Sequence, residues 1–252
     1  MMKEADIPEL TTHNGIATIT LRRPQQANRL SPDDLAALAR QIDAVNAMPQ
    51  VLVLQLRARG KYFCSGYDIR QIGSGQGVDF EGVVDALERA RPVTIAVMQG
   101  GVYGGATDLA LACDFRLGAQ TIDMFMPAAR LGLHFYRSGL QRYVSRLGLN
   151  AAKRLFLAGE RMDAPEMKAI GFLTHLAEPQ ELDAQAQRLC DAVAGMAPLA
   201  LLGMKRHLND IARGELDPVA LQDDIVRAAR SDDLREGQSA WAEKRAPQFK
   251  GS

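Results

Sequence analysis

The feature that most constrains the fold is a regular alternation of apolar runs and amphipathic helices in the first half of the chain. The runs 51–56 and 93–98 are almost continuously apolar, which is typical of short strands buried on both faces of a sheet. A β-branched run at 15–21 precedes them and also predicts a strand. Helical spacing fills the intervals between these runs. One predicted helix begins at the capping residue Ser31, and another stops before Pro92. This order predicts an α/β fold with helices packed on a sheet.

The second half of the chain is mainly helical in character. Asn150 is expected to begin a helix that ends near Gly159, and residues 163–166 form a second start of the capping-box kind. From about residue 180 onward only helical periodicity is found. We therefore expect an α/β core over residues 1–190 and a helical region over residues 191–252.

Charge and cysteine content exclude several classes of partner. Thirty Lys+Arg balance thirty Asp+Glu, so no net field attracts nucleic acid or an anionic membrane. The three cysteines lie far apart without a C-x-x-C pair, which predicts neither a disulfide framework nor a zinc site and favours a reducing, cytoplasmic setting. No apolar stretch reaches membrane-spanning length. We expect a soluble, unsecreted protein whose partner is a small molecule or another protein.

Two strand ends carry the residues that could do chemistry. The segment FCSGYDI at 63–69 follows the first buried run, and GGVYGGATDLA at 100–110 follows the second. Small residues between a strand and a helix can leave backbone amides free to bind an oxyanion. Taken alone, the glycines at 100–105 are equally typical of a tight turn. Their spacing matches neither the P-loop nor the dinucleotide-binding pattern.

Taken together, the two segments resemble those of the enoyl-CoA hydratase/isomerase (crotonase) superfamily. Its patterns are F-x-[AS]-G-x-D-[IL] and G-x-x-x-G-G-G-x-[ED]-L-[AL], in this order and at this separation. The resemblance implies a crotonase-like spiral of ββα units with a C-terminal helical trimerisation region, in a homotrimer or a dimer of trimers. Further matches spread over nearly the whole chain: Arg23-Pro24, Ala27-Asn28, Cys113-Asp114, Leu131-Gly132, Gln141-Arg142 and the C-terminal stretch KRAPQF at 244–249.

The resemblance also implies an acyl-CoA substrate and an enolate intermediate. The thioester oxygen would accept hydrogen bonds from two backbone amides, assigned here to Ser65 and Gly105. Donors of this kind contribute about 3–4 kcal/mol each to an oxyanionic transition state. Coenzyme A enters as part of the substrate, so no permanently bound cofactor and no metal is expected. Contacts to it are assigned to Gln25, Ala27, Gly66, Asp68 and Ile69, with Phe249 and Lys250 reaching a neighbouring subunit.

The acid/base residues depart from the pattern of the family's hydratases, which activate water with two glutamates. The first glutamate corresponds to Asp108, whose side chain is shorter by one C–C bond, about 1.5 Å. The second corresponds to Ala128, which has no carboxylate. His134 and Tyr136 follow nearby and could supply a proton donor, although a histidine or tyrosine in a loop is more often a packing or surface residue. The candidate catalytic residues are therefore Asp108, Tyr136 and His134.

The missing glutamate favours isomerase or malonyl-type CoA decarboxylase chemistry over ordinary hydration. Both reactions need a stabilised enolate and one acid/base group, and an apolar pocket would disfavour the charged ground state of a departing carboxylate. The residues do not separate these two reactions. A hydratase with a rearranged site and a catalytically silent CoA-binding protein are the alternatives.

Overall fold

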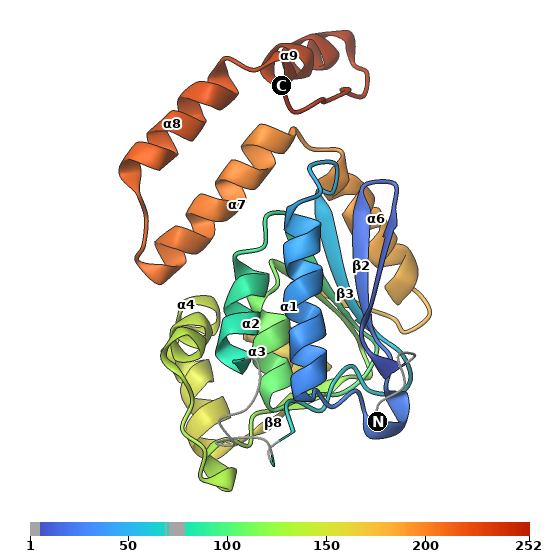
Figure 1. Ribbon diagram of the computed structural model, residues 1–252, viewed down its shortest axis with the longest axis vertical. Helices are drawn as coiled ribbons and strands as arrows, with labels where there is room; N and C mark the ends of the chain where they lie inside the picture. The colour runs from blue at the N-terminus through green and yellow to red at the C-terminus, as the bar shows by residue number, and fades with distance from the viewer. Residues whose placement is uncertain (1–5, 69, 71–78) are drawn as a thin grey trace.

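The computed structural model describes residues 6–68, 70 and 79–252, and its main sheet confirms the predicted α/β fold (Figure 1). Within these residues six strands pair in the order β1-β2-β3-β4-β6-β9. All neighbours are parallel except the β1–β2 hairpin. The strands are β1 (Glu9–His13), β2 (Ile16–Leu21), β3 (Val53–Ala58), β4 (Val93–Met98), β6 (Phe115–Ala119) and β9 (His175–Ala177).

Helices cover both faces of this sheet (Figure 1). On one face α1 (Pro32–Asn46), α2 (Phe80–Glu88) and α3 (Gly105–Ala112) pack side by side, and α4 (Arg137–Lys153) packs against α2 and α3. On the other face α6 (Leu182–Ala194) contacts β3, β4 and β6. The helix α1 begins where predicted, because Ser31 and Asp34 form a reciprocal capping box.

A second, smaller sheet positions the other glycine-containing turn. It consists of β5 (Val102–Tyr103), β7 (Asp123–Phe125) and β8 (Arg161–Asp163), in the order β5-β7-β8. The helix α3 starts two residues after β5, so the turn at Gly104 is held between a strand and a helix. The short helix α5 (Ala164–Ala169) follows β8 and begins at the predicted cap, where Asp163 accepts the amide hydrogen of Glu166.

The C-terminal helices form an arm at one end of the molecule, whereas β8 lies at the other end (Figure 1). The arm consists of α7 (Pro198–Arg213), α8 (Pro218–Ala229) and α9 (Asp232–Glu243). A boundary at residue 190 would cut α6, which packs on the sheet, so the arm begins at α7. The tail is tied to α9, because the amides of Lys250 and Gly251 donate to the Asp233 carboxylate at 2.7 and 2.9 Å.

Besides the strands β5, β6, β7, β8 and β9, two elements were not predicted from the sequence. The strand β1 joins β2 through Asn14 and Gly15, which both have positive φ, 48° and 75°. An Asn-Gly pair of this kind is a strong hairpin signal. The first part of α4 is the other, since Gly148 interrupts that helix with φ 80° and ψ 159° and separates it from the predicted helix near Asn150. Among the described residues, no helix has the length and apolar character needed to traverse a bilayer.

Candidate active site

The two glycine-containing turns lie directly against each other. The amide of Tyr103 donates to the carbonyl of Cys64 at 3.0 Å, which joins the segment after β3 to β5. Gly66 has φ +94°, and a Cβ on it would lie 2.8 Å from the carbonyl oxygen of Tyr103 and 3.1 Å from the amide nitrogen of Gly105. A side chain here would be strained and would also meet backbone. The turns are therefore brought together as predicted.

The structure contradicts the assignment of Ser65 as an oxyanion donor. Its amide donates to the carbonyl oxygen of Ala27 at 2.9 Å and is not available to a ligand. Tyr67, two residues later, has an amide that finds no acceptor in the described part of the chain. Leu30 donates to Gly66 and accepts from Asp68, which directs the peptide N–H of Tyr67 away from Leu30. No side-chain signal could have singled out Tyr67, because the group concerned is backbone.

Gly105 has the free amide that the sequence predicted. It is the first residue of α3, where backbone N–H groups have no partner inside the helix. Within the residues described, no acceptor for it is found. A Cβ on Gly105 would lie 2.8 Å from the ring of Phe80, so that ring packs close to the backbone here. Among the residues that the structure describes, the amides of Tyr67 and Gly105 are thus a pair of donors without an acceptor at the junction of the two turns.

Asp108 is enclosed rather than solvated. Its side chain is fully buried, and Arg142 Nη1 lies 2.8 Å from both carboxylate oxygens. The hydroxyl of Tyr136 donates a hydrogen bond to Oδ2. Burial raises the pKa of Asp108, and the charge of Arg142 opposes that rise. Both oxygens are therefore engaged, and the carboxylate has no open side toward solvent.

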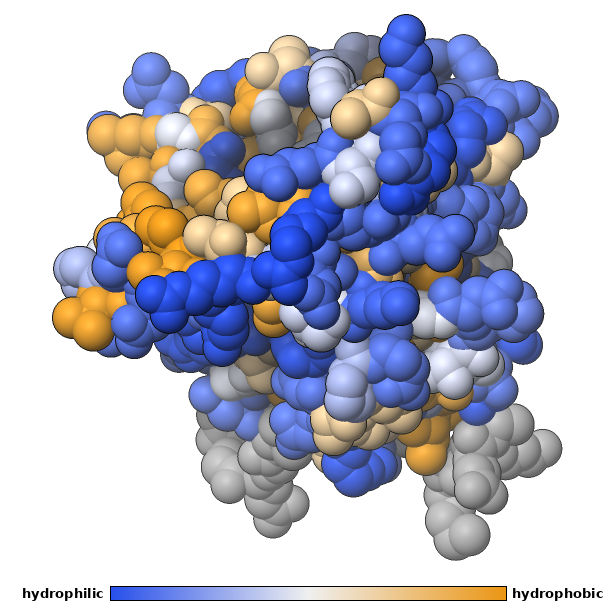
Figure 2. Space-filling view, turned by 90° about the horizontal axis from the view of Figure 1, so that it is seen from above, coloured by the Kyte–Doolittle hydropathy of each residue, from blue (hydrophilic) through white to orange (hydrophobic). Residues whose placement is uncertain are grey.

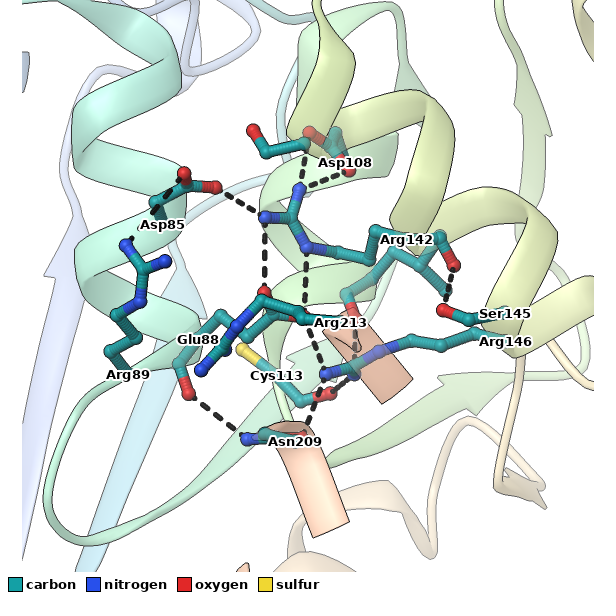
Figure 3. A network of polar contacts seen from close by, with 12 residues as sticks. Asp85, Glu88, Arg89, Asp108, Cys113, Arg142, Ser145, Arg146, Asn209 and Arg213 are labelled. Carbon is teal, nitrogen blue, oxygen red and sulfur yellow. Dashed lines mark hydrogen bonds and ion pairs between the residues drawn. The ribbon is translucent and has the colours of Figure 1, made fainter. Parts of the chain in front are cut away.

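Arg142 belongs to a wider network of buried charges (Figure 3). It donates to Glu88 at 3.0 Å and to Asp85 at 2.6 Å as well as to Asp108. Burial alone lowers the pKa of Arg142, but the carboxylates of Asp108 and Glu88 raise it overall. Glu88 also accepts from Arg146 at 2.9 Å, and these arginines lower its pKa although burial acts in the opposite direction. Sequence reasoning gave Arg142 no role.

A signal for Arg142 was nevertheless present in the sequence. Gly139, Arg142 and Tyr143 are the buried positions in the first part of α4, and Arg146 follows Arg142 by four residues. Residues three and four apart share one face of a helix. An arginine on the inward face of a helix needs carboxylates as partners. For Arg142 these are Asp85 and Glu88 of α2 and Asp108 of α3.

Tyr136 is the candidate that the structure places against Asp108. Burial, followed by the charge of Asp108, raises the pKa of Tyr136, so the phenol stays neutral. Its ring stacks on Phe135 with centroids 4.3 Å apart and meets Phe80 edge-on at 6.2 Å. Phe80 in turn covers Gly105, which links Tyr136 to the free amides. His134 is exposed, and its Nδ1 lies 2.7 Å from the carbonyl of Phe135, so it is not brought to Asp108.

The position of the second glutamate holds a packed methyl group. Ala128 is 4% exposed and belongs to the hydrophobic core. Its neighbour Pro127 lies 3.9 Å from where a Cβ on Gly104 would be, so this segment borders the second turn. Ala128 therefore contributes only a methyl group at the position of the second glutamate.

The residues assigned to coenzyme A fall into two groups. Near the turns, Gln25 is exposed, Ala27 holds the Ser65 amide, Gly66 is buried, and Asp68 is held by Arg70 at 2.8 Å. Ile69 lies outside the described residues. The second group is on the arm, where Phe249 packs near Gly237 of α9 and Lys250 is bonded to Asp233. The arm lies at the far end of the same chain (Figure 1).

Comparisons with known proteins agree with this architecture. Residues 11–252 match the family described as enoyl-CoA hydratase/isomerase. The chain is 31% identical over 250 residues to YngF of Bacillus subtilis, named for the same hydratase/isomerase family, which covers 94% of this chain and 95% of that protein. It is 28% identical over 256 residues to the carnitinyl-CoA dehydratase of Proteus mirabilis, which covers 96% and 97%.

A solved structure extends the likeness to three dimensions. An enoyl-CoA hydratase/carnithine racemase from Magnetospirillum magneticum has a TM-score of 0.90 at 26% identity, with 98% of this chain and 96% of that chain covered. The likeness therefore covers nearly the whole chain, including most of the C-terminal arm. The chain belongs to the enoyl-CoA hydratase/isomerase family.

Proposed function

We propose that this member of a family of acyl-CoA enzymes decarboxylates a malonyl-type CoA thioester through an enolate. The thioester oxygen would lie between the amides of Tyr67 and Gly105, which are the free donors where the two turns meet. Two preorganised amides of this kind stabilise the negative charge that develops on the oxygen. This proposal replaces Ser65 by Tyr67 and keeps the predicted intermediate.

The observation that carries the proposal is the enclosure of Asp108. Isomerisation of a double bond begins when a base removes a proton, and hydration needs carboxylates that activate water. Asp108 serves neither reaction well, because Arg142 and Tyr136 occupy both of its oxygens and Ala128 offers no second carboxylate. Decarboxylation needs no base, since loss of CO₂ itself leaves the electron pair on the α-carbon.

After CO₂ is lost, the α-carbon of the enolate must be protonated. We assign this step to Tyr136. When the bond between the α-carbon and the carboxylate breaks, CO₂ leaves and its bonding electrons form the thioester enolate. The hydroxyl of Tyr136 then rotates about the phenolic C–O bond from Asp108 toward the α-carbon. The proton of this hydroxyl passes to the α-carbon. The phenolate then recovers a proton from solvent. The rings of Tyr67, Phe80 and Tyr136 contact one another and would form the apolar wall of the acyl site. Such a wall disfavours the charged carboxylate of the substrate.

The test compares substrates and one conservative variant. We expect CO₂ release from malonyl-, methylmalonyl- or ethylmalonyl-CoA, with one solvent deuterium at the α-carbon of the product in D₂O. Tyr136→Phe should lower kcat by about 10²-fold, because it removes the proton donor and keeps the ring. Faster turnover of crotonyl-CoA or a 3-enoyl-CoA than of every malonyl-type thioester would overturn the proposal. Tight coenzyme A binding in a calorimeter without any turnover would point to a silent binding protein.

The pKa values of Asp108 and Tyr136 are both raised, and these shifts predict an asymmetric pH profile for kcat. Asp108 accepts the Tyr136 hydrogen bond as a carboxylate, and its raised pKa means that this acceptor is lost, as pH falls, at a higher pH than for an ordinary aspartate with pKa 3.8. The raised pKa of Tyr136 keeps the donor protonated through the ordinary tyrosine value of about 10. We expect any acid limb to lie at a higher pH than the ordinary aspartate pKa, and no alkaline limb below the ordinary tyrosine pKa of about 10. An alkaline limb near pH 9 that Tyr136→Phe removes would contradict this assignment.

We also propose that the arm assembles copies of this chain into a homotrimer or a dimer of trimers. Figure 2 views the molecule from the side of the arm and shows hydrophobic side chains gathered on one part of that face. Trp241 of α9 is 88% exposed and borders an apolar groove that Leu199, Leu234 and Phe249 also line. A neighbouring subunit that covers this groove would also meet Phe249 and Lys250.

Light scattering at micromolar concentration tests this assembly. We expect a mass of three or six chains for the native protein and a shift toward the monomer for Trp241→Glu, because a buried carboxylate without a partner opposes association. Arg188→Glu, an exposed change on α6, serves as the control and should keep the assembly. A scattering mass of one chain for the native protein would contradict the proposal.

A further inference from the structure

A chain of two buried hydroxyl groups ends on the peptide that carries the Gly105 amide. Thr107 Oγ1 donates to the carbonyl oxygen of Gly104 at 2.6 Å, and the Tyr143 hydroxyl is hydrogen-bonded to the same Oγ1. A threonine hydroxyl has one hydrogen, so Tyr143 must be the donor in its bond to Thr107. The order of donation is therefore Tyr143 to Thr107 to Gly104. Thr107 is 1% exposed and Tyr143 is fully buried, so water does not compete.

Gly104 is held by this hydroxyl chain together with a backbone hydrogen bond, because its carbonyl oxygen also accepts from the Thr107 amide at 3.0 Å. Its φ of 54° and ψ of −131° are accessible to a glycine, which has little conformational preference of its own. The peptide that joins Gly104 to Gly105 is planar, so its C=O and N–H directions are fixed relative to each other. A hydrogen bond that holds the carbonyl oxygen therefore also sets the direction of the Gly105 N–H.

We propose that Thr107 and Tyr143 are positioning residues that aim the Gly105 amide at the substrate oxygen. The inference rests on the proposed function, because it assigns a task to the same pair of amides. Tyr143 neighbours Arg142 in the sequence, so α4 holds both the Gly104 peptide and the Asp108 carboxylate. A misplacement of about 1 Å at a reacting centre can lower a rate by about 10²-fold, which gives this hydroxyl chain a kinetic consequence.

The test uses the carbonyl stretch of bound butyryl-CoA, which needs no turnover. Two amide donors should shift this stretch of a ¹³C-labelled thioester to lower frequency on binding. Thr107→Val keeps the shape but removes the hydroxyl, so we expect the shift to shrink markedly and kcat to fall about 10- to 100-fold with little change in KM. Thr107→Ser restores the hydroxyl and should recover both the shift and the rate.

The outcomes separate this inference from the proposed function. If native protein shows no frequency shift, the amide site itself is wrong. If native protein and Thr107→Val show the same shift, the site stands and the positioning role is wrong, whatever the rate on malonyl-type substrates. Tyr143→Phe gives a second reading should Thr107→Val fail to fold, because it removes only the donor to Thr107. We expect a smaller loss of the shift in that variant, and an unchanged shift there would also overturn the inference.

Discussion

Replacing Arg142 by leucine should lower the free energy of unfolding by about 3–5 kcal/mol, the range for removal of one partner from a buried ion pair. The variant leaves Asp108 fully buried and Glu88 5% exposed without their main cation. Urea or guanidinium denaturation at one protein concentration measures the loss, since assembly makes apparent stability depend on concentration. Arg188→Leu removes an arginine from an exposed pair with Glu181 and is the control, which should barely move the midpoint.

The pH dependence of this loss gives a second check. In the variant, Asp108 and Glu88 would be buried carboxylates without Arg142, so both should bind protons more readily than in the native protein. The destabilisation is therefore largest at neutral pH and shrinks as pH falls and the carboxylates become neutral. A loss below 1 kcal/mol at pH 7, or one that grows on acidification, would show that other groups satisfy these carboxylates.

The alternation of strands and helices in the first half of the chain could be predicted from the sequence because burial leaves a local trace. The continuous apolar runs at 51–56 and 93–98 became β3 and β4, and Ser31 capped α1 as expected. The hairpin at Asn14 also has a local signal, which is the Asn-Gly pair. These features depend on residues near one another in the chain, so a pattern of a few residues is sufficient to indicate them.

The site could be predicted only in part, for reasons that differ between residues. The Gly105 amide follows from the position of a helix start, which the sequence marks. Whether the amide of Ser65 or of Tyr67 is free depends on the distant Ala27 and Leu30, so it becomes visible only in the fold. The same is true of Asp108, whose environment is set by Arg142 on another helix. The shorter carboxylate was visible in the sequence, whereas its enclosure was not.

Gly105→Pro should lower kcat/KM by about 10²–10³-fold relative to Gly105→Ala, the effect of deleting one oxyanion donor. Both substitutions place a Cβ 2.8 Å from the Phe80 ring, so alanine is the control for the displacement that this carbon causes. They differ in the amide, which proline lacks. Proline suits the first position of a helix, and Gly104 before it has no Cβ to clash with the proline ring, so the fold should survive.

The comparison between the two variants decides the role of the amide. Steady-state kinetics on the best malonyl-type thioester give the ratio, and circular dichroism with thermal melts confirms that both variants are folded. A transition-state interaction predicts that most of the loss lies in kcat, because the ground-state carbonyl carries less charge than the enolate oxygen. If proline and alanine at residue 105 gave equal rates, the Gly105 amide would not contact the reacting oxygen, and the enolate mechanism would lose one of its two supports.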